Sequence, residues 1–463
     1  AAMPAPPTAE RTLPLRVRNA LGYRSVPANT LSVYVHNLSK NETVLEWRAE
    51  TPRNPASVMK LLTTLIALDT LGPTYTWRTD VYPRGPIEAD RLDGDLLLKG
   101  YGDPFLVTER VWQMLRELRR GGLRRISGDL LLDDSYFAVG DYDPAAFDRQ
   151  PLRSYNVGPN ALMMNFKTVR YFFEPVAEQN AVRIRLDPNL ENLTIVNKLS
   201  VANRSCRGYQ RGIAVIPNRA HDEIAFEGQF PSGCEIYSMA RSALSHNAFS
   251  YGLFKRLWAD VGGTLDGGWR NTVLNSEEHA EPLLSFDSWP LADVISRVNK
   301  FSNNVMARHL LLTVAAETYG APGTEDNGRR AIAEWLARRG LDDDAFFLAN
   351  GAGLSRSSRT TAKQLAGLLR FAYAQPYMPE FLSSMSLTGL DGTTSRRFRS
   401  DDPLAGRAHL KTGSLDHVSA IAGYVQSRAG DRYAVVTLQN HEDIHRGPGE
   451  EVQEALLRWI YEL

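Results

Sequence analysis

The stretch NPASVMKLLTTLIALDTLG, residues 54–72, carries apolar side chains around almost the whole circumference of the helix that its spacing predicts. A helix of this kind is buried on all sides, so we expect it at the centre of the fold. Ser57 and Lys60 stand near its start, three residues apart and therefore on one face. Burying a charged ammonium group is costly, so the position of Lys60 requires a chemical reason.

The apolar surroundings of Lys60 are explained if this lysine acts as a base toward Ser57. A serine hydroxyl is a weak nucleophile at neutral pH and needs a base within hydrogen-bond reach. An ordinary lysine has a pKa of about 10.4, and moving that pKa toward about 7 takes roughly 4 kcal/mol. An apolar core and a second cation nearby would supply this shift. The pair alone is weak evidence, because S-x-x-K occurs by chance in most chains of this length and Ser57 could simply cap the helix.

Two later stretches complete a pattern with this pair. KFSNNVMARHLL places Ser302 and Asn304 just before a strongly apolar helix, and HLKTGSLDHV places a K-T-G-S run, beginning at Lys411, on a predicted edge strand. S-x-x-K, S-x-N and K-T-G, in that order, form the motif set of penicillin-binding proteins and serine β-lactamases. The order, and the matching helix-start, loop and strand contexts, argue against a chance combination.

Alternating strands at both ends of the chain, with helices between them, predict an α/β sandwich. A hairpin pattern covers residues 31–50, and two further strands cover 409–427 and 432–440, with RAGDR as the turn between them. We expect one antiparallel sheet that joins N- and C-terminal segments. The predicted helices cover residues 54–72, 250–262, 291–320, 328–340 and 449–463.

Residues 84–245 change in character and indicate a mostly β insertion. The sequence GDLLL occurs at 94–98 and again at 128–132, with a helical pattern between, which predicts a βαβ unit. Further short strands complete the insertion. We therefore expect a multidomain α/β protein in which residues 1–83 and 246–463 form one discontinuous catalytic domain, since 463 residues suggest two or three domains.

The three motifs and the large insertion resemble the class C low-molecular-mass penicillin-binding proteins, which act as D-alanyl-D-alanine carboxypeptidases and endopeptidases. A compact β-lactamase needs far fewer residues between its first two motifs. The resemblance covers essentially the whole chain, including GDLLLKGYGDP, GPNALMMNFKTV, NGAGLSR and LDGTTSRRF. It implies a serine β-lactamase/transpeptidase-like domain interrupted by two small, mostly β domains. It also implies peptidoglycan stem peptides and cross-links as substrates, acylation by β-lactam antibiotics, and neither cofactor nor metal.

The resemblance implies a role for each residue of the first two motifs. Ser57 would attack the carbonyl of the penultimate D-alanine and form an acyl-enzyme, while unprotonated Lys60 would accept the hydroxyl proton. Ser302 would relay a proton to the leaving amine and so link Lys60 to Lys411. Asn304 would hold the amide carbonyl of the substrate.

The K-T-G-S strand would bind the other end of the substrate. Lys411 would lower the pKa of the catalytic lysine and, with Thr412 and Ser414, would attract the substrate carboxylate. The backbone N–H groups of Ser57 and Ser414 would form an oxyanion hole. At Gly413 a side chain would block the substrate lying along this edge.

Three further positions bear on substrate choice. Arg356, in GLSRSSR, matches the family arginine that faces the diaminopimelate end of the peptide, although it could instead be a solvated cap of a helix. Asp416, where close relatives are expected to have glutamine, would meet the diaminopimelate amine or reduce affinity for its carboxylate. Asp148, in AAFDRQ of the insertion, is a further candidate for the same role.

Composition and termini bear on the compartment and on partners. Basic and acidic residues number 53 each, so no basic face for nucleic acid is expected. No apolar run is long enough to span a membrane. AAMPAPPTAE contains no signal sequence and is interpreted as the start of an exported chain after signal removal, with a frayed cytoplasmic terminus as the alternative.

The cysteine content favours the first of these two alternatives. Cys206 and Cys234, the only cysteines, are predicted to form a disulfide. It would close a loop of about 29 residues, worth roughly 3–4 kcal/mol. A disulfide implies an oxidising compartment, so we expect a periplasmic or otherwise extracytoplasmic protein.

Other interpretations stay open at this point. NHEDIH contains H-E-x-x-H at His441, Glu442 and His445, the zinc-protease signature, although RGPG directly after it would stop the helix that this signature needs. A serine β-lactamase, or a non-hydrolytic penicillin-binding or wall-sensing protein, would carry the same three motifs. The helix at 250–262 could make a peripheral membrane contact or be buried in the fold.

Overall fold

The computed structural model describes residues 12–207, 212–274, 281–399 and 401–463. These residues form two compact units, each with a hydrophobic core of its own. The first unit takes in the described residues up to Tyr75 together with Trp289–Leu463, and the second is Thr76–Ser288. Residues 1–11, on which the expectation of a removed signal rests, lie outside the described residues.

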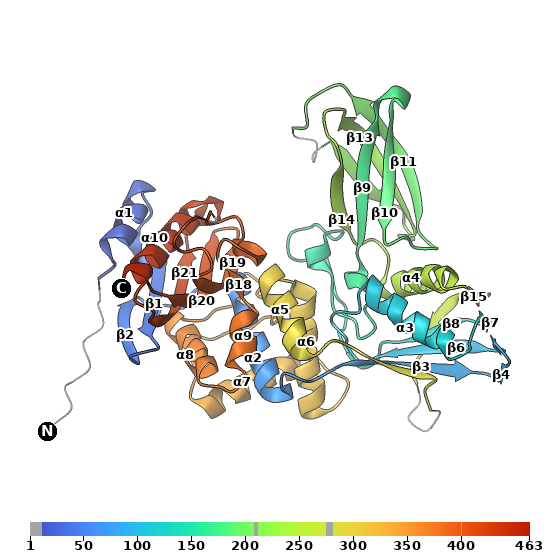
Figure 1. Cartoon of the computed structure of the whole chain (residues 1–463), viewed down its shortest axis with the longest axis horizontal. Helices are drawn as coiled ribbons and strands as arrows, with labels where there is room; N and C mark the ends of the chain where they lie inside the picture. Colours follow the sequence, from blue (N-terminus) through green and yellow to red (C-terminus); the bar gives the residue numbers. More distant parts are fainter. Residues whose placement is uncertain (1–11, 208–211, 275–280, 400) are drawn as a thin grey trace. The chain divides into compact units, whose positions relative to one another are not determined.

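A six-stranded sheet organises the first unit (Figure 1). The first strand of the chain pairs directly with the last one, with Leu31 opposite Gln439 and Asn37 opposite Tyr433. All neighbouring strands are antiparallel, so the sheet joins N- and C-terminal segments as predicted. In order across the sheet, the strands are β18 (Ser386–Leu387), β19 (Ala408–Leu415), β20 (Val418–Gln426), β21 (Arg432–Asn440), β1 (Leu31–Asn37) and β2 (Glu42–Trp47).

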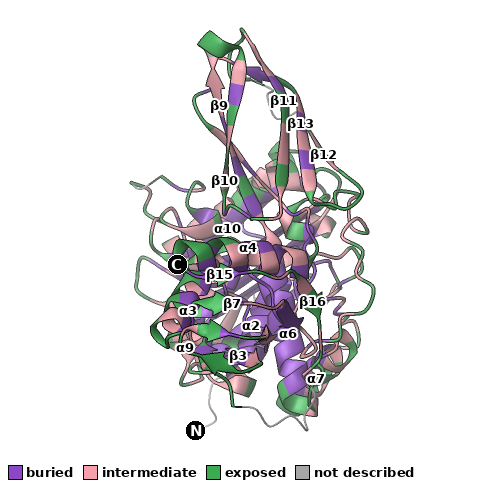
Figure 2. Cartoon of the chain, turned by 90° about the vertical axis from the view of Figure 1, so that its right-hand side faces the viewer, coloured by how far each residue is buried: buried purple, intermediate pink, exposed green. Residues whose placement is uncertain are grey.

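Helices cover both faces of this sheet (Figure 1). They are α1 (Leu15–Tyr23), α2 (Lys60–Leu71), α5 (Leu291–Phe301), α6 (Asn304–Tyr319), α7 (Glu325–Arg339), α8 (Ala362–Tyr373), α9 (Met378–Ser383) and α10 (Pro448–Glu462). α10 packs on β20 and against α1, whereas α8 packs on β21 and β1. α2 packs against α5 and α6, and Figure 2 shows α2 and α6 largely buried.

The predicted central helix begins as the 3-10 turn Ala56–Met59 and continues as α2. All residues from Lys60 to Leu68 are buried, which is what its apolar circumference predicted. The helix ends at Gly72, whose φ of 85° is open to glycine without steric cost.

The predicted helix at 291–320 is wrong at one point, because the chain breaks between α5 and α6. Ser302 ends α5 with φ 56° and ψ 38°, a left-handed conformation that cannot continue a right-handed helix. Asn303 then caps α6, its side chain accepting a hydrogen bond from the N–H of Met306. The break places a serine and an asparagine side by side at the junction of two buried helices.

The second unit contains the βαβ element predicted from the GDLLL repeat. Its parallel strands β6 (Asp95–Gly100) and β8 (Leu130–Asp133) are joined through α3 (Thr108–Arg120). They belong to a five-stranded sheet with the order β16 (Trp269–Asn271), β8, β6, β3 (Arg78–Arg84) and β17 (Leu284–Asp287). A smaller sheet has the order β15 (Thr264–Leu265), β7 (Arg125–Ile126), β5 (Arg91–Leu92) and β4 (Ile87–Glu88).

Two three-stranded sheets complete the second unit. One has the order β10 (Ala181–Asp187), β9 (Val169–Val176) and β14 (Tyr237–Arg241), and the other β11 (Thr194–Ala202), β13 (Glu223–Pro231) and β12 (Ile213–Pro217). Aromatic rings fill the space between them: Phe226 of β13 lies 5.0 Å from the Tyr171 ring and 5.1 Å from the Phe173 ring of β9. Cys206, after β11, and Cys234, after β13, are joined by a disulfide.

This unit takes in more residues than the range 84–245 expected for the insertion. β3 pairs with both β6 and β17, so strands before and after that range belong to one sheet. Helix α4 (His246–Asp260) buries Phe254 and Trp258 in the core of the same unit, although its sequence was assigned to the catalytic domain. Pairing between strands distant in sequence sets these boundaries, and composition does not reveal it.

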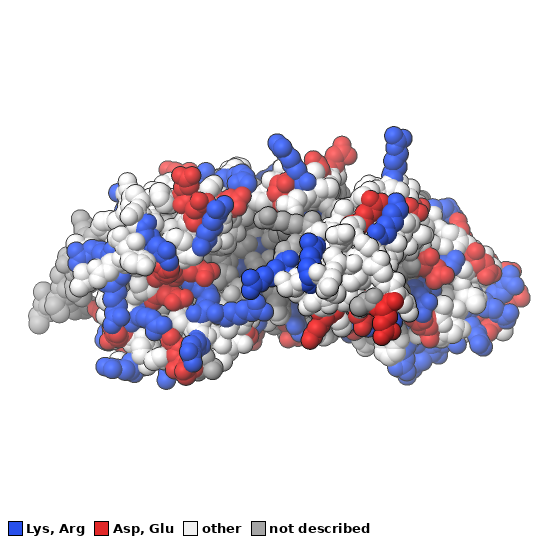
Figure 3. Space-filling model, turned by 90° about the horizontal axis from the view of Figure 1, so that it is seen from above, with Lys and Arg blue, Asp and Glu red and all other residues white. Residues whose placement is uncertain are grey.

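Three observations on the described residues bear on membrane and nucleic-acid contacts. The apolar side chains of α4 are used inside the core, which disfavours a membrane contact through this helix. Among the described residues, no helix is both long and apolar enough to cross a membrane. Basic and acidic side chains are mixed over the face shown in Figure 3, in keeping with the zero net charge.

Candidate active site

Ser57 follows a residue with a strained backbone. Ala56 has a φ of 47°, in the left-handed region that costs an L-residue about 1–2 kcal/mol. Two glycines leave room for this turn: a Cβ added to Gly353 would lie 2.0 Å from the carbonyl oxygen of Ala56, and one added to Gly413 would lie 2.5 Å from that of Pro55. The segment that carries Ser57 is therefore held closely between the NGAGLSR loop and β19.

Lys60 is fully buried and directs its amine toward three oxygen atoms. Its Nζ lies 2.8 Å from Ser57 Oγ, 2.7 Å from Asn304 Oδ1 and 2.5 Å from the carbonyl oxygen of Ala352. The amide and carbonyl oxygens can only accept, so each takes one N–H of the amine. A neutral amine has two N–H groups and one lone pair, and the lone pair is left for the hydroxyl proton of Ser57.

The surroundings of Lys60 favour this neutral form. Complete burial, followed by repulsion from Lys411 and Arg308, lowers the pKa of Lys60 well below its ordinary value of 10.5. Arg308 is itself buried, on α6, so its charge is weakly screened. Arg308 therefore supplies a permanent second cation, and Lys411 adds to the repulsion when it is protonated.

Lys411, on β19, is a second buried lysine. Its Nζ lies 3.0 Å from Ser302 Oγ and 2.7 Å from the carbonyl oxygen of Thr412. Burial lowers the pKa of Lys411 to about 7. Because a nearby negative charge favours the protonated form, an anionic ligand would restore its charge. Of the two contacts expected for Ser302, with Lys60 and with Lys411, the structure gives the one with Lys411.

The K-T-G-S strand is partly covered on its outer side. β18 pairs with His409 and Leu410, and from Lys411 onward the described pairing of β19 is with β20 alone. Thr412 Oγ1 donates to Thr393 Oγ1 at 2.7 Å. Ser414 is exposed. The edge therefore remains open along the residues that the sequence assigned to substrate.

The packing of β19 gives a structural reason for the glycine at position 413. A Cβ at this position would lie 2.5 Å from the Pro55 carbonyl oxygen and 3.2 Å from the Ser57 nitrogen. A side chain would therefore strike the segment that carries the serine. The absence of a side chain lets β19 approach the Ser57 backbone.

The structure brings Arg356 and Asp416 together. Arg356 Nη2 lies 3.6 Å from Asp416 Oδ2, and His445 Nε2 lies 3.6 Å from the other carboxylate oxygen. The Arg356 and Asp416 side chains are 60% and 65% exposed, so their pairing is worth at most about 1 kcal/mol. A charged substrate group could exchange with either partner at little cost.

Asp148 belongs to the second unit and is engaged by its own loop. Its carboxylate accepts hydrogen bonds from Tyr155 Oη at 2.6 Å and Asn156 Nδ2 at 2.7 Å, and from the N–H of Gln150 at 3.0 Å. Partial burial raises the pKa of Asp148, but these hydrogen bonds outweigh it and the net pKa is lowered. The carboxylate is thus kept ionised and has a structural use in its loop.

The H-E-x-x-H stretch does not have the geometry of a zinc site. The residues after His441 form a turn and then a short 3-10 helix, so His441 and His445 do not share an α-helical face. His417, Asp443 and His445 do lie close together, with possible ligand atoms within 4.8 Å of one another. However, Nδ1 of His445 accepts the N–H of His417, and Nδ1 of His417 accepts the N–H of Asp443. Each imidazole therefore carries its proton on Nε2, whereas a metal-binding histidine donates through the ring nitrogen that does not bind the metal.

Three groups at the site are not predicted by the sequence motifs. The carbonyl oxygen of Ala352 accepts from Lys60, Thr393 accepts from Thr412, and Arg308 repels the charge of Lys60. Ala352 and Thr393 lie in NGAGLSR and LDGTTSRRF, where the family resemblance was the only signal. For Arg308 the signal was a cation inside a strongly apolar helix.

Comparison with known proteins places this geometry in a family. The sequence profile of the D-Ala-D-Ala carboxypeptidase 3 (S13) family matches residues 17–463. The chain is 25% identical over 409 residues to the D-alanyl-D-alanine carboxypeptidase DacB of Haemophilus influenzae, covering 87% of this chain and 84% of that protein. It is 28% identical over 425 residues to the D-alanyl-D-alanine carboxypeptidase of an Actinomadura species, covering 87% and 76%.

Solved structures show the same fold. The crystal structure of penicillin binding protein 4 (dacB) from Haemophilus influenzae matches with a TM-score of 0.80 at 22% identity, covering 97% of this chain and all of that one. A predatory endopeptidase from Bdellovibrio bacteriovorus matches with a TM-score of 0.53 at 16% identity, covering 93% and 92%. The predicted multidomain, transpeptidase-like α/β fold is confirmed.

Proposed function

The chain belongs to the D-Ala-D-Ala carboxypeptidase 3 (S13) family, and from this premise we propose that Ser57 is its nucleophile and Lys60 the base. The enzyme is a serine-type D-Ala-D-Ala carboxypeptidase, which removes the terminal D-alanine of a peptide through an acyl-enzyme. The observation that carries the assignment is the set of three contacts at Lys60 Nζ. Two of them use up the N–H groups of a neutral amine, and the third presents its lone pair to the serine hydroxyl.

Acylation follows from this geometry. As Ser57 Oγ bonds to the penultimate carbonyl carbon, its proton moves to the lone pair of Lys60. The peptide bond to the terminal D-alanine then breaks, and the proton held by Lys60 passes through Ser302 to the leaving nitrogen; Ser302 also contacts Lys411, at 3.0 Å. Water next attacks the ester carbon and returns a proton to Ser57 through Lys60, which frees the shortened peptide.

The K-T-G-S strand supplies the binding groups. Lys411, with Thr412 and Ser414, is assigned to the terminal carboxylate of the substrate, since a buried lysine with a pKa of about 7 gains charge when an anion arrives. The N–H groups of Ser57 and Ser414 form the oxyanion hole, at roughly 3–4 kcal/mol per donor. The close approach of β19 that Gly413 permits supports this pairing.

Selection of the peptide side chain is assigned to the exposed charges beside the strand. Arg356 and Asp416 present opposite charges that a zwitterionic diaminopimelate end can match, carboxylate to arginine and amine to aspartate. Because cross-links in the wall end on such a residue, we also propose DD-endopeptidase activity for this site.

We place the enzyme outside the cytoplasm, in the periplasm or an equivalent compartment. Peptides that end in D-Ala-D-Ala belong to the cell wall, and the Cys206–Cys234 disulfide persists in an oxidising environment. No peripheral membrane contact is assigned to α4, because its apolar residues are used in the core.

The test is the release of D-alanine from a pentapeptide muropeptide, together with cleavage of a cross-linked muropeptide dimer. The wild-type enzyme should perform both reactions and Ser57→Ala neither. D-alanine release without dimer cleavage would remove the endopeptidase proposal and leave the carboxypeptidase assignment intact. Release at the wild-type rate by Ser57→Ala would refute the assigned nucleophile.

Exposure to benzylpenicillin separates the proposed enzyme from the two open alternatives. The proposed enzyme should form a long-lived adduct of one antibiotic molecule on Ser57, visible by intact mass. A β-lactamase would instead hydrolyse the antibiotic within seconds and leave no adduct. A sensing protein would hold the adduct and release no D-alanine from any muropeptide.

A further inference from the structure

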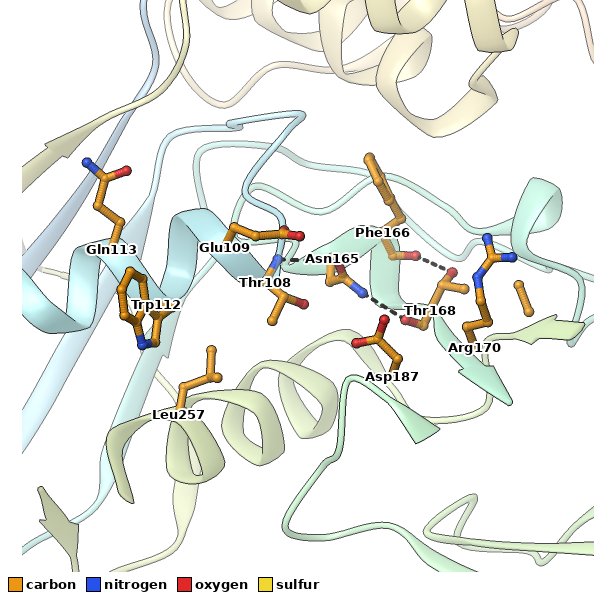
Figure 4. A pocket seen from close by; sticks show the side chains of 11 residues that line it. Thr108, Glu109, Trp112, Gln113, Asn165, Phe166, Thr168, Arg170, Asp187 and Leu257 are labelled. Carbon is orange, nitrogen blue, oxygen red and sulfur yellow. Dashed lines mark hydrogen bonds between the residues drawn. The ribbon is translucent and has the colours of Figure 1, made fainter. Parts of the chain in front are cut away.

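A large pocket lies inside the second unit and takes no part in the site described above. Its volume is about 810 Å³, within the range of small-molecule sites. α3, α4, the turn Asn165–Lys167 and the neighbouring strands surround it (Figure 4). All residues that line it belong to this unit, so the pocket is complete there.

An exposed tryptophan forms the apolar part of this pocket. Trp112, on α3, is 41% exposed, and its ring and Leu257 of α4 lie together at one end of the pocket in Figure 4. The guanidinium of Arg116 lies 4.8 Å from the centre of the Trp112 ring. A guanidinium stacked on an aromatic ring restrains it, so the ring is held as a flat platform. An indole surface left in contact with water is costly, and a ligand with a flat apolar face would cover it.

Charged and polar side chains line the rest of the wall together with Phe166 and Ala240. The carboxylates of Glu109 and Asp187 line the pocket and, among the described residues, make no side-chain hydrogen bond or ion pair. Arg170 lines it as well, with a single long contact of 3.5 Å to Ser238 Oγ. Figure 4 shows the Asp187 carboxylate directed toward Asn165. Acceptors and donors thus line the pocket beyond the aromatic platform at its end.

The turn that closes this wall has an unusual backbone. Asn165, Phe166 and Lys167 have φ values of 45°, 55° and 51°, three consecutive left-handed residues without a glycine. Each costs about 1–2 kcal/mol, so the surrounding structure must hold the turn in place. Asn165 does part of this, because its Oδ1 accepts the N–H of Thr108 at the start of α3 and its Nδ2 donates to the carbonyl of Thr168. The wall is therefore fixed before any ligand arrives.

These features together match a sugar. A pyranose ring has a flat face of C–H groups that packs on indole and a rim of hydroxyls that donate to carboxylates and accept from arginine. Two carboxylates and one guanidinium disfavour a strongly anionic ligand, and these three charged groups also disfavour a purely apolar one. We propose that this pocket binds the glycan strand of peptidoglycan through its N-acetylated amino sugars. The proposal rests on the proposed function, because the glycan is the part of that polymer to which the D-Ala-D-Ala peptides are attached.

A second attachment to the same polymer has a kinetic consequence. A glycan held by the second unit raises the effective concentration of its stem peptides near the enzyme, without any change at Ser57. The enzyme should therefore favour peptides still attached to glycan over free peptides of the same sequence. This preference should depend on the pocket.

The direct test is titration of the full chain carrying Ser57→Ala with chitotetraose, and with glycan strands stripped of peptide by an amidase. We expect binding by calorimetry and by tryptophan fluorescence, and a loss of affinity of about tenfold or more in Trp112→Ala. Asp187→Asn, a nearly isosteric change at an exposed position, should also weaken binding. It is the variant to use if Trp112→Ala lowers the melting temperature of the protein. Ile216→Ala, which removes a 46% exposed apolar side chain in the same unit, is the matched control and should bind as the parent does.

The outcomes separate this proposal from the proposed function. Absence of binding by both glycans, or equal binding by the parent, Trp112→Ala and Asp187→Asn, would overturn the glycan site. Trp112-dependent binding of a stem peptide without sugar would overturn it in favour of a peptide site. The titration needs no catalysis. If the wild type failed to release D-alanine, the proposed carboxypeptidase activity would be refuted and the binding result would still stand. In enzymes that retain Ser57, the ratio of activity on sacculi to activity on free pentapeptide should fall in Trp112→Ala and not in Ile216→Ala.

Discussion

The buried amine of Lys60 contacts three oxygen atoms, and its surroundings favour the neutral form of the amine. Two of its partners, Asn304 Oδ1 and the Ala352 carbonyl oxygen, accept hydrogen bonds only. Burial and the charges of Lys411 and Arg308 act in the same direction, lowering the pKa of Lys60. The proposed base thus lies beside Ser57 in surroundings that disfavour its charged form, and strain at Ala56 is the conformational cost of placing the serine there.

Ser302 offers a prediction at the scale of one residue. Its left-handed φ of 56° disfavours any L-residue, so Ser302→Ala keeps the backbone strain and loses the hydroxyl, whereas Ser302→Gly loses both. We expect both variants to lose about 10²–10⁴-fold in D-alanine release, since both lack the proton relay. Chemical unfolding should find Ser302→Gly more stable than Ser302→Ala by ~0.5–1 kcal/mol. Near-normal activity in either variant would remove Ser302 from the proton path.

Single residues differ in how far the sequence predicts them. Ser57, Lys60, Ser302 and Lys411 could be proposed because each stands in a motif with fixed spacing and context. The Ala352 carbonyl could not, because any residue type offers the same backbone oxygen and only the fold determines which one reaches Lys60.

At the scale of elements, the close approach of β19 to the Ser57 segment is the feature that assembles the site. The Lys60 amine and the K-T-G-S strand come from opposite ends of the chain and meet because β19 lies against the turn before α2. Gly413 is the point of closest approach, since a Cβ there would contact both Pro55 and Ser57.

Gly413→Ala should therefore slow the acylation of Ser57, because the added methyl group displaces β19. The added Cβ would meet the Pro55 carbonyl oxygen at 2.5 Å, a contact that cannot persist, so β19 and the Ser57 segment must separate. A displacement approaching 1 Å in reacting groups can cost about a hundredfold, and we expect at least that loss in the rate of adduct formation with benzylpenicillin. Gly22→Ala is the control, because a Cβ there meets nothing within 4 Å and Ala favours the helix. Equal rates in both variants would contradict the account of Gly413.

Periodicity predicted most elements and missed those that depend on distant contacts. The apolar circumference of α2, the β1–β2 hairpin and the βαβ repeat were all visible in the sequence. The apolar pattern of 291–320 runs through the break at Ser302, and only the S-x-N motif, expected in a loop before an apolar helix, indicated it. α4 was assigned to the first unit, but it packs in the second, because the sequence of a buried helix does not indicate which of two cores buries it.

At the scale of the whole molecule, two buried lysines make stability depend on pH. Lys411 has a pKa of about 7 in the folded enzyme and an ordinary value of 10.5 when unfolded, so between these values the unfolded chain binds more protons. Stability of the first unit should therefore fall as the pH drops from about 10.5 to about 7, with Lys60 acting in the same direction. Lys411→Met should reduce this slope in urea unfolding series at several pH values. An unchanged slope would show that Lys411 is not neutral in the folded state.

Two units with separate cores predict two calorimetric transitions. Acylation by benzylpenicillin should raise only the transition of the first unit, because the ligand binds its folded state. Reduction of the Cys206–Cys234 disulfide should lower only the transition temperature of the second unit, because in the loop-entropy account it removes roughly 3–4 kcal/mol of that unit's stability. Scans of the antibiotic-treated, the reduced and the untreated protein test this directly. A single transition that responds to both treatments would show that the units unfold together.

The most direct test of the central claim is the rate at which benzylpenicillin adds to Ser57, followed by intact mass across pH. A neutral Lys60 predicts a rate that rises with pH and levels off well below 10.5, since the pKa of Lys60 is lowered. Arg308→Gln should move the rising limb to higher pH by removing a repelling charge, whereas Arg338→Gln, at an exposed helix position, should leave it in place. A limb centred near 10.5, or one that Arg308→Gln does not move, would contradict the claim that buried cations keep Lys60 unprotonated.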